Sequence, residues 1–291
     1  MKIKIIGTTG DPWAAALKNA LPKTSSKKVA VLCGAAVQIW CTPLFWIARY
    51  RELWLTGYED FSGIVKRLIR IMSRLTHAIL APNQAIEAQY LKIGIPGDKL
   101  SLIYPPCEPN NSRAASQDAF VVGCDAETDF DHGLGALIRA IKEANDILGN
   151  ARLLIGGTAA DKSRIEWMAK ELNIKHAVRV VPSREYDWVG QCHVFAFLRK
   201  PGSTPSLALI HALSQGLPII CNDALSNREF VQNQKNGILL KDANSEMLSQ
   251  TIINLARKPE WRGQMSAASL TFAEQRLNPE LAHKKIQALI P

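Results

Sequence analysis

The chain has 291 residues and a formal net charge of +9, and 47% of its residues are hydrophobic. This length and apolar content suffice for one large core or two smaller ones, and they exclude a disordered, collagen-like or repeat protein. The six cysteines show no CxxC pairing and several lie in apolar runs, which indicates reduced, buried thiols in a cytosolic protein.

The positive charge is concentrated in the first part of the chain. Residues 1–110 hold 14 Lys and Arg against 7 Asp and Glu, whereas residues 111–291 hold 21 against 19. A basic half favours an anionic neighbour, which is a membrane surface, a phosphorylated substrate or a nucleic acid, and a solvated charged face is the simpler alternative. No RNA-binding signature accompanies the charge, so a nucleic-acid partner is not expected.

The chain opens with an apolar strand, a turn and a helix. Residues 3–6 alternate as a strand and residues 13–21 read as a helix, so this segment begins a strand–helix–strand unit. Because the strand starts directly at the N-terminus, no secretory signal is expected. The glycines of the turn would let a substrate approach the backbone closely, although a plain turn explains them as well. The candidate substrate-binding loop consists of Gly7, Thr8, Thr9 and Gly10.

An uncharged run at residues 29–48 is long enough for a transmembrane helix. Gln38 and Pro43 interrupt it, its first residues are β-rich, and basic residues flank both ends, so no orientation bias appears. We therefore favour a buried parallel strand from Val29, then a loop, then an aromatic and basic helix that runs from Pro43 through Trp54.

A second basic segment follows at residues 63–75. Its cations alternate with apolar residues at helical spacing, which predicts an amphipathic basic helix. Such helices bind the headgroup layer of anionic membranes, and the alternative is an ordinary surface helix whose apolar side faces the core. The cations are Lys66, Arg67, Arg70 and Arg74, and the apolar residues are Ile64, Leu68, Ile71, Met72 and Leu75.

Strands and helices alternate through the rest of the chain, interrupted by a Pro-, Asn- and Ser-rich linker. The expected strands are 77–82, 100–104, 119–123, 151–155, 178–181, 194–198 and 219–221, and the expected helices are 84–92, 134–148, 162–172, 185–191 and 205–215. The linker is 105–117. This alternation predicts parallel, doubly wound sheets, whose ligands bind beyond the carboxyl ends of the strands.

The stretch from Phe197 to Gly237 contains the strongest local pattern. Thr204 is a plausible N-cap, Pro205 suits the first helical residue, and Gly216 supplies a left-handed stop. A helix that begins in such a loop after a strand offers unpaired N–H groups and its dipole to an anion. The pattern therefore predicts an anion site at this turn.

Short motifs recur in a fixed order from His77 onward. They are Asn83, Gly94 to Leu100, Ile103 to Pro105, Gly133-Leu134, Leu153 to Gly157, Ala212 to Pro218, Asn227 to Val231 and Asn236 to Leu240. In this order and spacing the chain resembles the retaining glycosyltransferases of the GT-B fold, the large group 1 family, over about two thirds of its length.

The resemblance implies two Rossmann-like, doubly wound α/β domains that face a cleft. The acceptor-side domain is expected at 1–110, which is short for the family, and the nucleotide-sugar-binding domain at 118–275. A C-terminal helix at 276–291 is expected to cross back to the first domain.

The resemblance also implies a donor chemistry without metal or cofactor. In the family, cations and a helix N-terminus neutralise the diphosphate leaving group, and two glutamates contact the sugar and the ribose. In this chain the glutamate positions hold Ser203 and His211, the phosphate-turn glycine positions hold Thr204 and Ser206, and the expected cation positions hold Glu127 and His132. The acidic residues Asp125, Glu127, Asp129 and Asp131 would repel a diphosphate.

The candidate donor site replaces these family residues with others nearby. Arg199 and Lys200 would supply the lost positive charge, and His211 would hydrogen-bond a hydroxyl group, although two solvated cations and a core histidine are the simpler alternatives. The donor-binding candidates are Gly156, Gly157, Arg199, Lys200, Ser203, Thr204, Ser206, His211 and Glu229. No catalytic residue and no metal ligand is assigned.

Two functions fit the sequence. The first is a metal-independent, retaining glycosyltransferase that moves a hexosyl unit from a nucleotide sugar to a glycan or lipid-linked acceptor, at the cytoplasmic face of a membrane, in polysaccharide biosynthesis. The second is a catalytically silent homologue that binds a partner. The identities of the donor, the acceptor and the linkage stay open.

Overall fold

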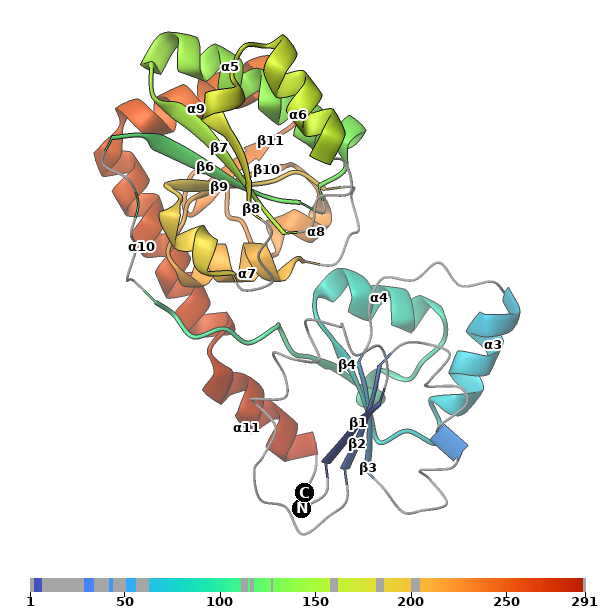
Figure 1. The fold of residues 1–291 in the computed structure, drawn as a ribbon. Coiled ribbons are helices and arrows are strands. Elements are labelled where there is room, and N and C mark those ends of the chain that lie inside the picture. The colour runs from blue at the N-terminus through green and yellow to red at the C-terminus, as the bar shows by residue number, and fades with distance from the viewer. Residues whose placement is uncertain are drawn as a thin grey trace. The chain divides into compact units, whose positions relative to one another are not determined.

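The computed structural model divides the chain into two compact units. One contains Met1–Cys107 and Arg276–Pro291, and the other contains Glu108–Gln275. Each unit has its own parallel sheet with helices packed on it (Figure 1). The structure describes residues 3–6, 29–33, 42–43, 51–55, 63–110, 115, 118–126, 128–157, 162–181, 186–199 and 205–289.

The first unit contains a five-stranded sheet whose strands pair in chain order. The strands are β1 (Ile3–Ile6), β2 (Val29–Cys33), β3 (Arg51–Leu55), β4 (Ala78–Ala81) and β5 (Leu100–Leu102). All of the pairings are parallel. The predicted buried strand at Val29 is confirmed as β2.

The predicted helix through Trp54 is wrong, because Arg51–Leu55 forms β3. This strand pairs with β2 on one side and β4 on the other, and both Leu53 and Trp54 are fully buried. The Trp54 indole donates a hydrogen bond to Thr42 Oγ1 at 3.1 Å. Pairing on both sides outweighs a weak local preference, and the aromatic and basic composition of the segment did not reveal it.

The described helices of the first unit are α3 (Gly63–Met72), α4 (Gln84–Lys92) and α11 (Pro279–Leu289), with a 3₁₀ turn η1 (Gly97–Lys99). The helix expected at 84–92 is confirmed as α4, and Asn83 caps it by accepting a hydrogen bond from the Ile86 N–H at 2.8 Å. Helices α3 and α4 bury Ile69, Ile86 and Tyr90 against Trp54 and Ile79 of the sheet. Within the described residues, no helix is long and apolar enough to cross a membrane.

Lys99 binds the turn that follows α3. Its ammonium group donates hydrogen bonds to the backbone oxygens of Ser73, Arg74 and Thr76, at 3.1, 2.6 and 2.8 Å. These oxygens lie just beyond the C-terminal end of α3, where a cation also matches the helix dipole. Burial lowers the pKa of Lys99 from its usual value.

The C-terminal segment is hydrogen-bonded to the strand end and linker of the same unit. The Lys285 ammonium donates to the Leu102 oxygen at 3.1 Å, and the Cys107 N–H donates to the Leu277 oxygen at 2.8 Å. The Arg276 guanidinium lies 3.4 Å from the Tyr104 hydroxyl. These contacts attach α11 to the segment that follows β5.

The second unit contains a six-stranded parallel sheet. Its strands are β6 (Phe120–Asp125), β7 (Ala151–Gly156), β8 (Val178–Val181), β9 (Val194–Phe197), β10 (Ile219–Asn222) and β11 (Gly237–Leu240). Their order is β11-β10-β9-β6-β7-β8, which confirms a doubly wound sheet. The chain order reverses between β6 and β9, and ligands of such sheets bind beyond the carboxyl ends of the strands at this point.

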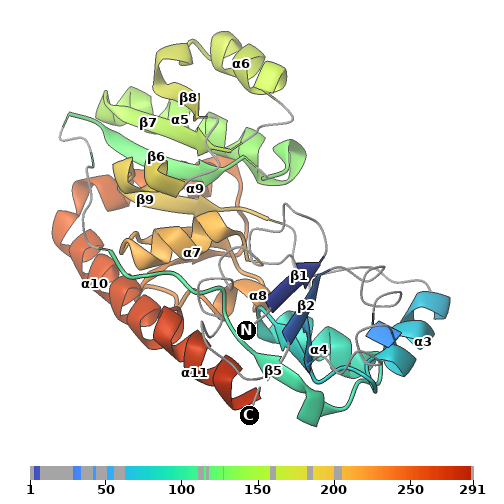
Figure 2. The same ribbon diagram turned by 60° about the horizontal axis from the view of Figure 1, so that its bottom comes forward.

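Helices cover both faces of this sheet. Figures 1 and 2 show α5 and α9 on one face and α7 on the other. Strands β6 and β9 are buried along their whole length, as expected for central parallel strands. The helices are α5 (Gly135–Leu148), α6 (Lys162–Glu171), α7 (Leu207–Ser214), α8 (Leu225–Arg228), α9 (Ser245–Arg257) and α10 (Pro259–Arg276). Short turns are η2 (Phe130–Leu134), η3 (Lys175–Ala177) and η4 (Tyr186–Gln191).

The turn after α7 holds α10 in place. Gly216 has a φ of +66°, which confirms the predicted left-handed stop. The Ser266 hydroxyl donates to the Gly216 oxygen at 2.6 Å, and the buried Ser269 hydroxyl donates to the Leu217 oxygen at 2.8 Å. Two serines of α10 thus satisfy the carbonyls of the turn.

Replacing Lys99 tests its contact with the turn after α3. Lys99→Met keeps the aliphatic stem and removes three hydrogen bonds to this turn, so we expect the amides at the C-terminal end of α3 to lose about tenfold in hydrogen-exchange protection. The measurement is hydrogen–deuterium exchange of peptides that cover α3. Lys170→Met, at an exposed position of α6, is the matched control and leaves that exchange unchanged. Unchanged exchange in Lys99→Met would show that Lys99 does not stabilise this end of the helix.

Candidate functional site

The loops that follow β6 and β9 meet at the point where the strand order reverses. A Cβ atom on Gly133 would lie 2.6 Å from Cβ of Leu198 and 3.0 Å from its backbone oxygen. Real Cβ atoms do not approach other atoms so closely, so only glycine permits this contact between the two loops. The Ala126 N–H also donates to the Gly156 oxygen at 2.9 Å, which joins the loop after β6 to the end of β7.

Gly156 has a packing role that the sequence did not reveal. A Cβ atom at this position would lie 1.8 Å from Cε2 of Trp188, whose side chain is buried in the second unit. The indole therefore occupies the space that a side chain would need. Gly157, by contrast, continues into the loop, where its N–H donates to the Val181 oxygen at 2.9 Å.

Gly123 was expected at the end of a strand and lies inside β6 instead. A Cβ atom there would lie 2.7 Å from Sγ of Cys192, so the missing side chain makes room for this buried cysteine. Burial raises the pKa of the Cys192 thiol above its usual value. The carboxyl end of β6 is therefore Asp125, two residues further along.

The N-cap of α7 is Ser206 and not Thr204, and the helix begins at Leu207 rather than at Pro205. The Ser206 backbone is extended, and its Oγ accepts a hydrogen bond from the Leu209 N–H at 3.2 Å. This geometry is that of an N-cap, in which the side-chain oxygen reaches the third N–H of the helix. The hydroxyl proton of Ser206 is still able to bind an anion.

Arg199 lies two residues after the end of β9. Ala196 of β9 is opposite Cys124 of β6, so Arg199 follows the carboxyl ends of both strands. Burial raises the pKa of the Cys124 thiol to about 12, and the positive charge of Arg199 acts in the opposite direction. The predicted role of Arg199 at an anion site stays a prediction.

The acidic residues after β6 are partly neutralised. Asp131 forms a bidentate pair with Arg164, at 2.5 and 3.2 Å, and this guanidinium also lies 4.0 Å from the centre of the Phe130 ring. The Asp129 carboxylate accepts a hydrogen bond from the Asp131 N–H at 2.9 Å. Such an exposed pair adds little stability, yet it balances the charge of Asp131 locally. The sequence alone predicts only repulsion from Asp131, because the pairing with Arg164 joins residues 33 positions apart.

His211 is stacked on Tyr186. The ring centres are 4.6 Å apart and the ring planes are inclined by 19°. Burial lowers the pKa of His211 to about 4, so the imidazole is neutral at pH 7. At the position where the family has a glutamate, this chain has a neutral ring that can donate and accept hydrogen bonds. Tyr186 was not selected from the sequence, because contact across 25 residues leaves no local signal.

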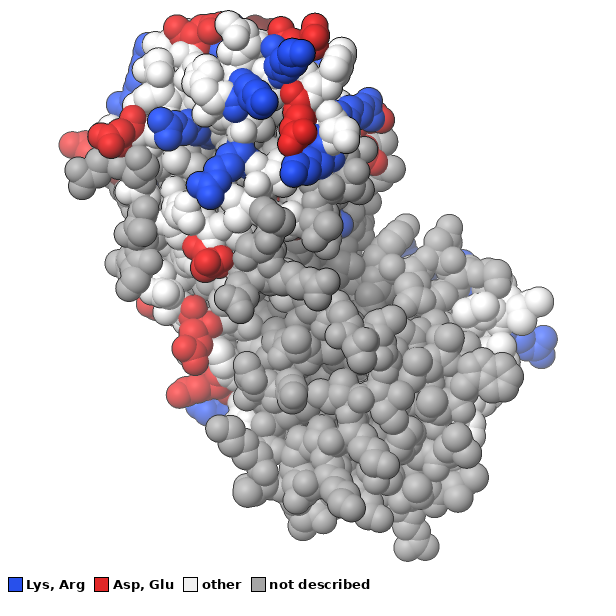
Figure 3. Space-filling model, viewed as in Figure 1, with Lys and Arg blue, Asp and Glu red and all other residues white. Residues whose placement is uncertain are grey.

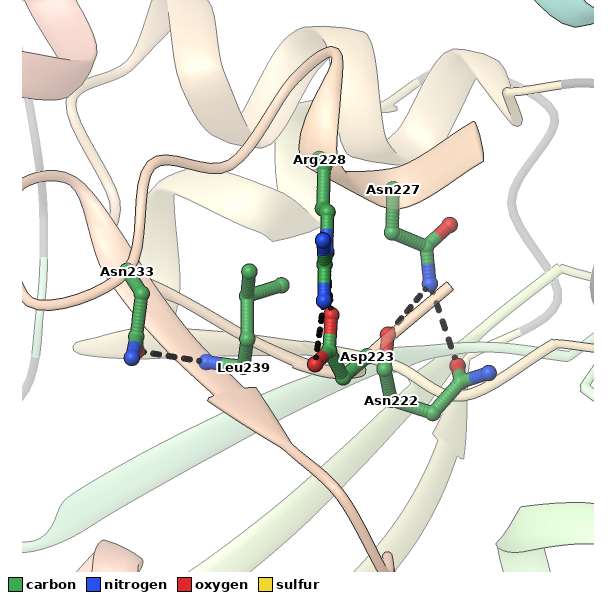
Figure 4. A network of polar contacts seen from close by, with 6 residues as sticks. All are labelled: Asn222, Asp223, Asn227, Arg228, Asn233 and Leu239. Carbon is green, nitrogen blue, oxygen red and sulfur yellow. Dashed lines mark hydrogen bonds and ion pairs between the residues drawn. The ribbon is translucent and has the colours of Figure 1, made fainter. Parts of the chain in front are cut away.

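A polar network shapes the turn after β10 (Figure 4). The Asn227 amide donates to the backbone oxygen and the side-chain oxygen of Asn222, at 2.8 and 3.1 Å. The Arg228 guanidinium pairs with both carboxylate oxygens of Asp223, at 2.6 and 2.9 Å, and this contact lowers the pKa of Asp223. Glu229, half-buried, follows immediately at the end of α8. The network fixes the turn that carries Glu229.

The described donor-site candidates lie on loops and helices that follow the parallel strands of one sheet. They are Gly156, Gly157, Arg199, Ser206, His211 and Glu229. The other candidates lie outside the described residues, namely Lys200, Ser203, Thr204, Gly7, Thr8, Thr9 and Gly10, as do Glu127 and the side chain of His132. Within the described ranges, no three His, Cys, Asp or Glu side chains are grouped to hold a metal ion.

A family model described as "Glycosyl transferases group 1" matches residues 114–270, which is more than half of the chain. The chain belongs to the group 1 glycosyltransferases. The sheet order, the glycine contacts and the α7 turn described above all lie within the matched residues.

Solved structures share the GT-B fold of this glycosyltransferase at low sequence identity. HepE of Anabaena in complex with UDP has a TM-score of 0.78 and 16% identity, over 95% of this chain and 80% of HepE. A glycosyltransferase of Rickettsia africae ESF-5 has a TM-score of 0.75 and 13% identity, over 98% and 82%. Sucrose-phosphate synthase of Thermosynechococcus elongatus has a TM-score of 0.71 and 15% identity, over 90% and 72%. No curated protein sequence matches the chain.

The packing role of Gly156 is testable by substitution. Gly156→Ala forces a methyl group into the Trp188 ring, and we expect the free energy of unfolding to fall by about 2 kcal/mol or more. The measurement is urea unfolding followed by circular dichroism. In Gly263→Ala, the control, the new methyl group meets open space within α10, so the protein gains about 0.5–1 kcal/mol. A neutral Gly156→Ala variant would show that the indole can move aside.

Protonation of His211 should destabilise the fold. The pKa is lowered from 6.5 to about 4, so between these values the unfolded chain binds the proton that the folded chain excludes. The stabilising contribution is complete above pH 6.5 and is lost as the pH falls, by about 3 kcal/mol near pH 4. His211→Phe keeps a stacked ring and removes this pH dependence in urea unfolding.

The control for this experiment is His176→Gln, at an exposed position of η3, which keeps the wild-type pH dependence. If His211→Phe retained the full wild-type slope between pH 4 and 6.5, another group would be responsible for it.

Proposed function

We propose that this protein transfers a hexosyl unit from a nucleotide-diphosphate sugar to a glycan or lipid-linked acceptor. The observation that carries the proposal is that both Arg199 and the N-terminus of α7 follow β9, at the point where the strand order reverses. Family membership supports a sugar transfer, and HepE, which shares the fold, binds UDP and UDP-glucose.

The diphosphate leaving group would bind at this turn. The bond between the anomeric carbon and the diphosphate breaks, and its electron pair goes to the diphosphate, so negative charge grows on the phosphate oxygens. Arg199 supplies positive charge, and the first N–H groups of α7 and the Ser206 hydroxyl donate hydrogen bonds. Lys200, Ser203 and Thr204 stand next to these groups in the sequence and would add to them.

The sugar and ribose would be held by neutral and acidic groups. His211 is neutral, so it hydrogen-bonds a hydroxyl of the donor without adding charge, and Tyr186 keeps its ring in place. Glu229 accepts a hydrogen bond from another hydroxyl, and Gly157 lets the donor approach the backbone.

The acceptor hydroxyl oxygen forms the new bond to the anomeric carbon and loses its proton. Retention of configuration and metal independence follow the family pattern, and no metal is needed where Arg199 and the helix dipole carry the charge. The basic first part of the chain suits an anionic surface, so we place the reaction at the cytoplasmic face of a membrane, in polysaccharide biosynthesis.

Nucleotide titration tests the donor site. We expect UDP or GDP, or one of their sugars, to bind in calorimetry, and Arg199→Ala to weaken the binding at least about tenfold because a charge-assisted contact is lost. His211→Ala removes the hydroxyl contact and weakens binding as well. Arg152→Ala is the matched control. Arg152 is exposed near the start of β7, so it lies at the amino ends of the strands and away from the proposed site.

Absence of binding to every nucleotide and nucleotide sugar at millimolar concentration would contradict the proposal and leave the catalytically silent homologue. Equal losses of nucleotide affinity in Arg199→Ala and Arg152→Ala would show that the diphosphate binds elsewhere.

A further inference from the structure

Helix α3 has one apolar face that belongs to the core of its own unit. Ile69 is fully buried, and Val65 and Met72 pack against the same cluster. At 3.6 residues per turn these residues share one side of the helix. This face accounts for the anchoring of α3 on the sheet.

The same helix carries a second apolar stripe that the core does not use. Ile64, Leu68 and Ile71 are 76%, 39% and 43% exposed. Their spacing of four and three residues places them within an arc of about 60° on the helix. Single exposed apolar residues need no explanation, but an aligned set on one helix marks an interaction surface.

Cations occupy the remaining side of α3. Lys66, Arg67 and Arg70 are exposed, and Arg74 follows the last turn. The helix contains no acidic residue, and the nearest ones in the sequence, Glu59 and Asp60, precede it. The face of the second unit that Figure 3 shows is different, since Lys and Arg alternate there with Asp and Glu. The charge of α3 therefore has one sign.

The helix does not need a partner in order to form. Its last carbonyls accept hydrogen bonds from the residues that follow, since the Ser73 N–H donates to the Ile69 oxygen at 2.8 Å and the Leu75 N–H donates to the Met72 oxygen at 2.9 Å. The Ile69 side chain is already seated in the core. A partner would thus meet a preformed surface with an apolar stripe beside a row of cations. An apolar stripe bordered by Lys and Arg fits the boundary between phosphate headgroups and acyl chains.

We infer that α3 docks on an anionic lipid bilayer, with Ile64, Leu68 and Ile71 inserted at the acyl-chain boundary and Lys66, Arg67 and Arg70 against the headgroup phosphates. The single sign of the charge selects an anionic surface as the occupant. This inference rests on the membrane location in the proposed function and assigns that location to one helix.

Vesicle co-sedimentation of the full chain tests the docking. We expect the protein to pellet with phosphatidylglycerol-containing vesicles at low salt, to dissociate at high salt, and to stay in the supernatant with pure phosphatidylcholine. The double variant Ile64→Ser/Leu68→Ser should bind at least about tenfold more weakly. Lys66→Glu/Arg67→Glu should lose binding at all salt concentrations.

Matched controls lie on α6 of the other unit. Trp167 is 62% exposed and Lys170 is exposed, so Trp167→Ser and Lys170→Glu change the same kinds of surface and should leave vesicle binding intact. The inference is overturned if the wild-type protein stays in the supernatant with anionic vesicles at low salt. Equal losses of vesicle binding in the α3 and α6 variants would overturn it too.

UDP titration of the same variants separates this inference from the donor-site proposal. We expect the α3 variants to bind nucleotide as the wild-type protein does, which also shows that they are folded. A wild-type protein that binds vesicles and no nucleotide would refute the donor site and leave the docking of α3 standing.

Discussion

The parallel pairing of β6 with β9 is the constraint on which the second unit depends. Val122 lies opposite Val194 in this pairing, and from these two central strands the chain proceeds outward in both directions. The loops after the two strands are therefore free to diverge at one edge, and Gly133 brings them back into contact at Leu198. Residues separated by some seventy positions in the sequence become neighbours for this reason alone.

Charge at this edge comes from few groups. Arg164 of α6 pairs with Asp131 of η2, and Arg228 of α8 pairs with Asp223 after β10. Arg199 and the dipole of α7 add positive potential beyond the end of β9. The partly buried, neutral His211 adds no positive potential, and it also adds no repulsion, which a carboxylate in the same place would do.

Local patterns in the sequence were sufficient to predict most elements of the second unit and helix α4 of the first. The strand at 178–181 is β8 to the residue, because its apolar run is bounded by turn residues. The helix through Trp54 was mistaken since β3 depends on pairing with two distant strands. The cap at Ser206 and the stacking of Tyr186 on His211 depend on exact backbone path and on tertiary contact, and neither has a periodic signal. The family resemblance proposed the site residues, and the neutral state of His211 follows from its environment in the fold.

The first unit differs from the second in its strand order, since β1 to β5 follow one another along the chain. Right-handed crossovers in such a sheet all fall on the same side, as α3 and α4 do. Among the described strands β1 pairs with β2 alone, so strands added beyond β1 by an insertion in the following loop would disturb no existing ladder. An insertion at this edge could therefore enlarge the first unit while the sheet of the second unit stays unchanged.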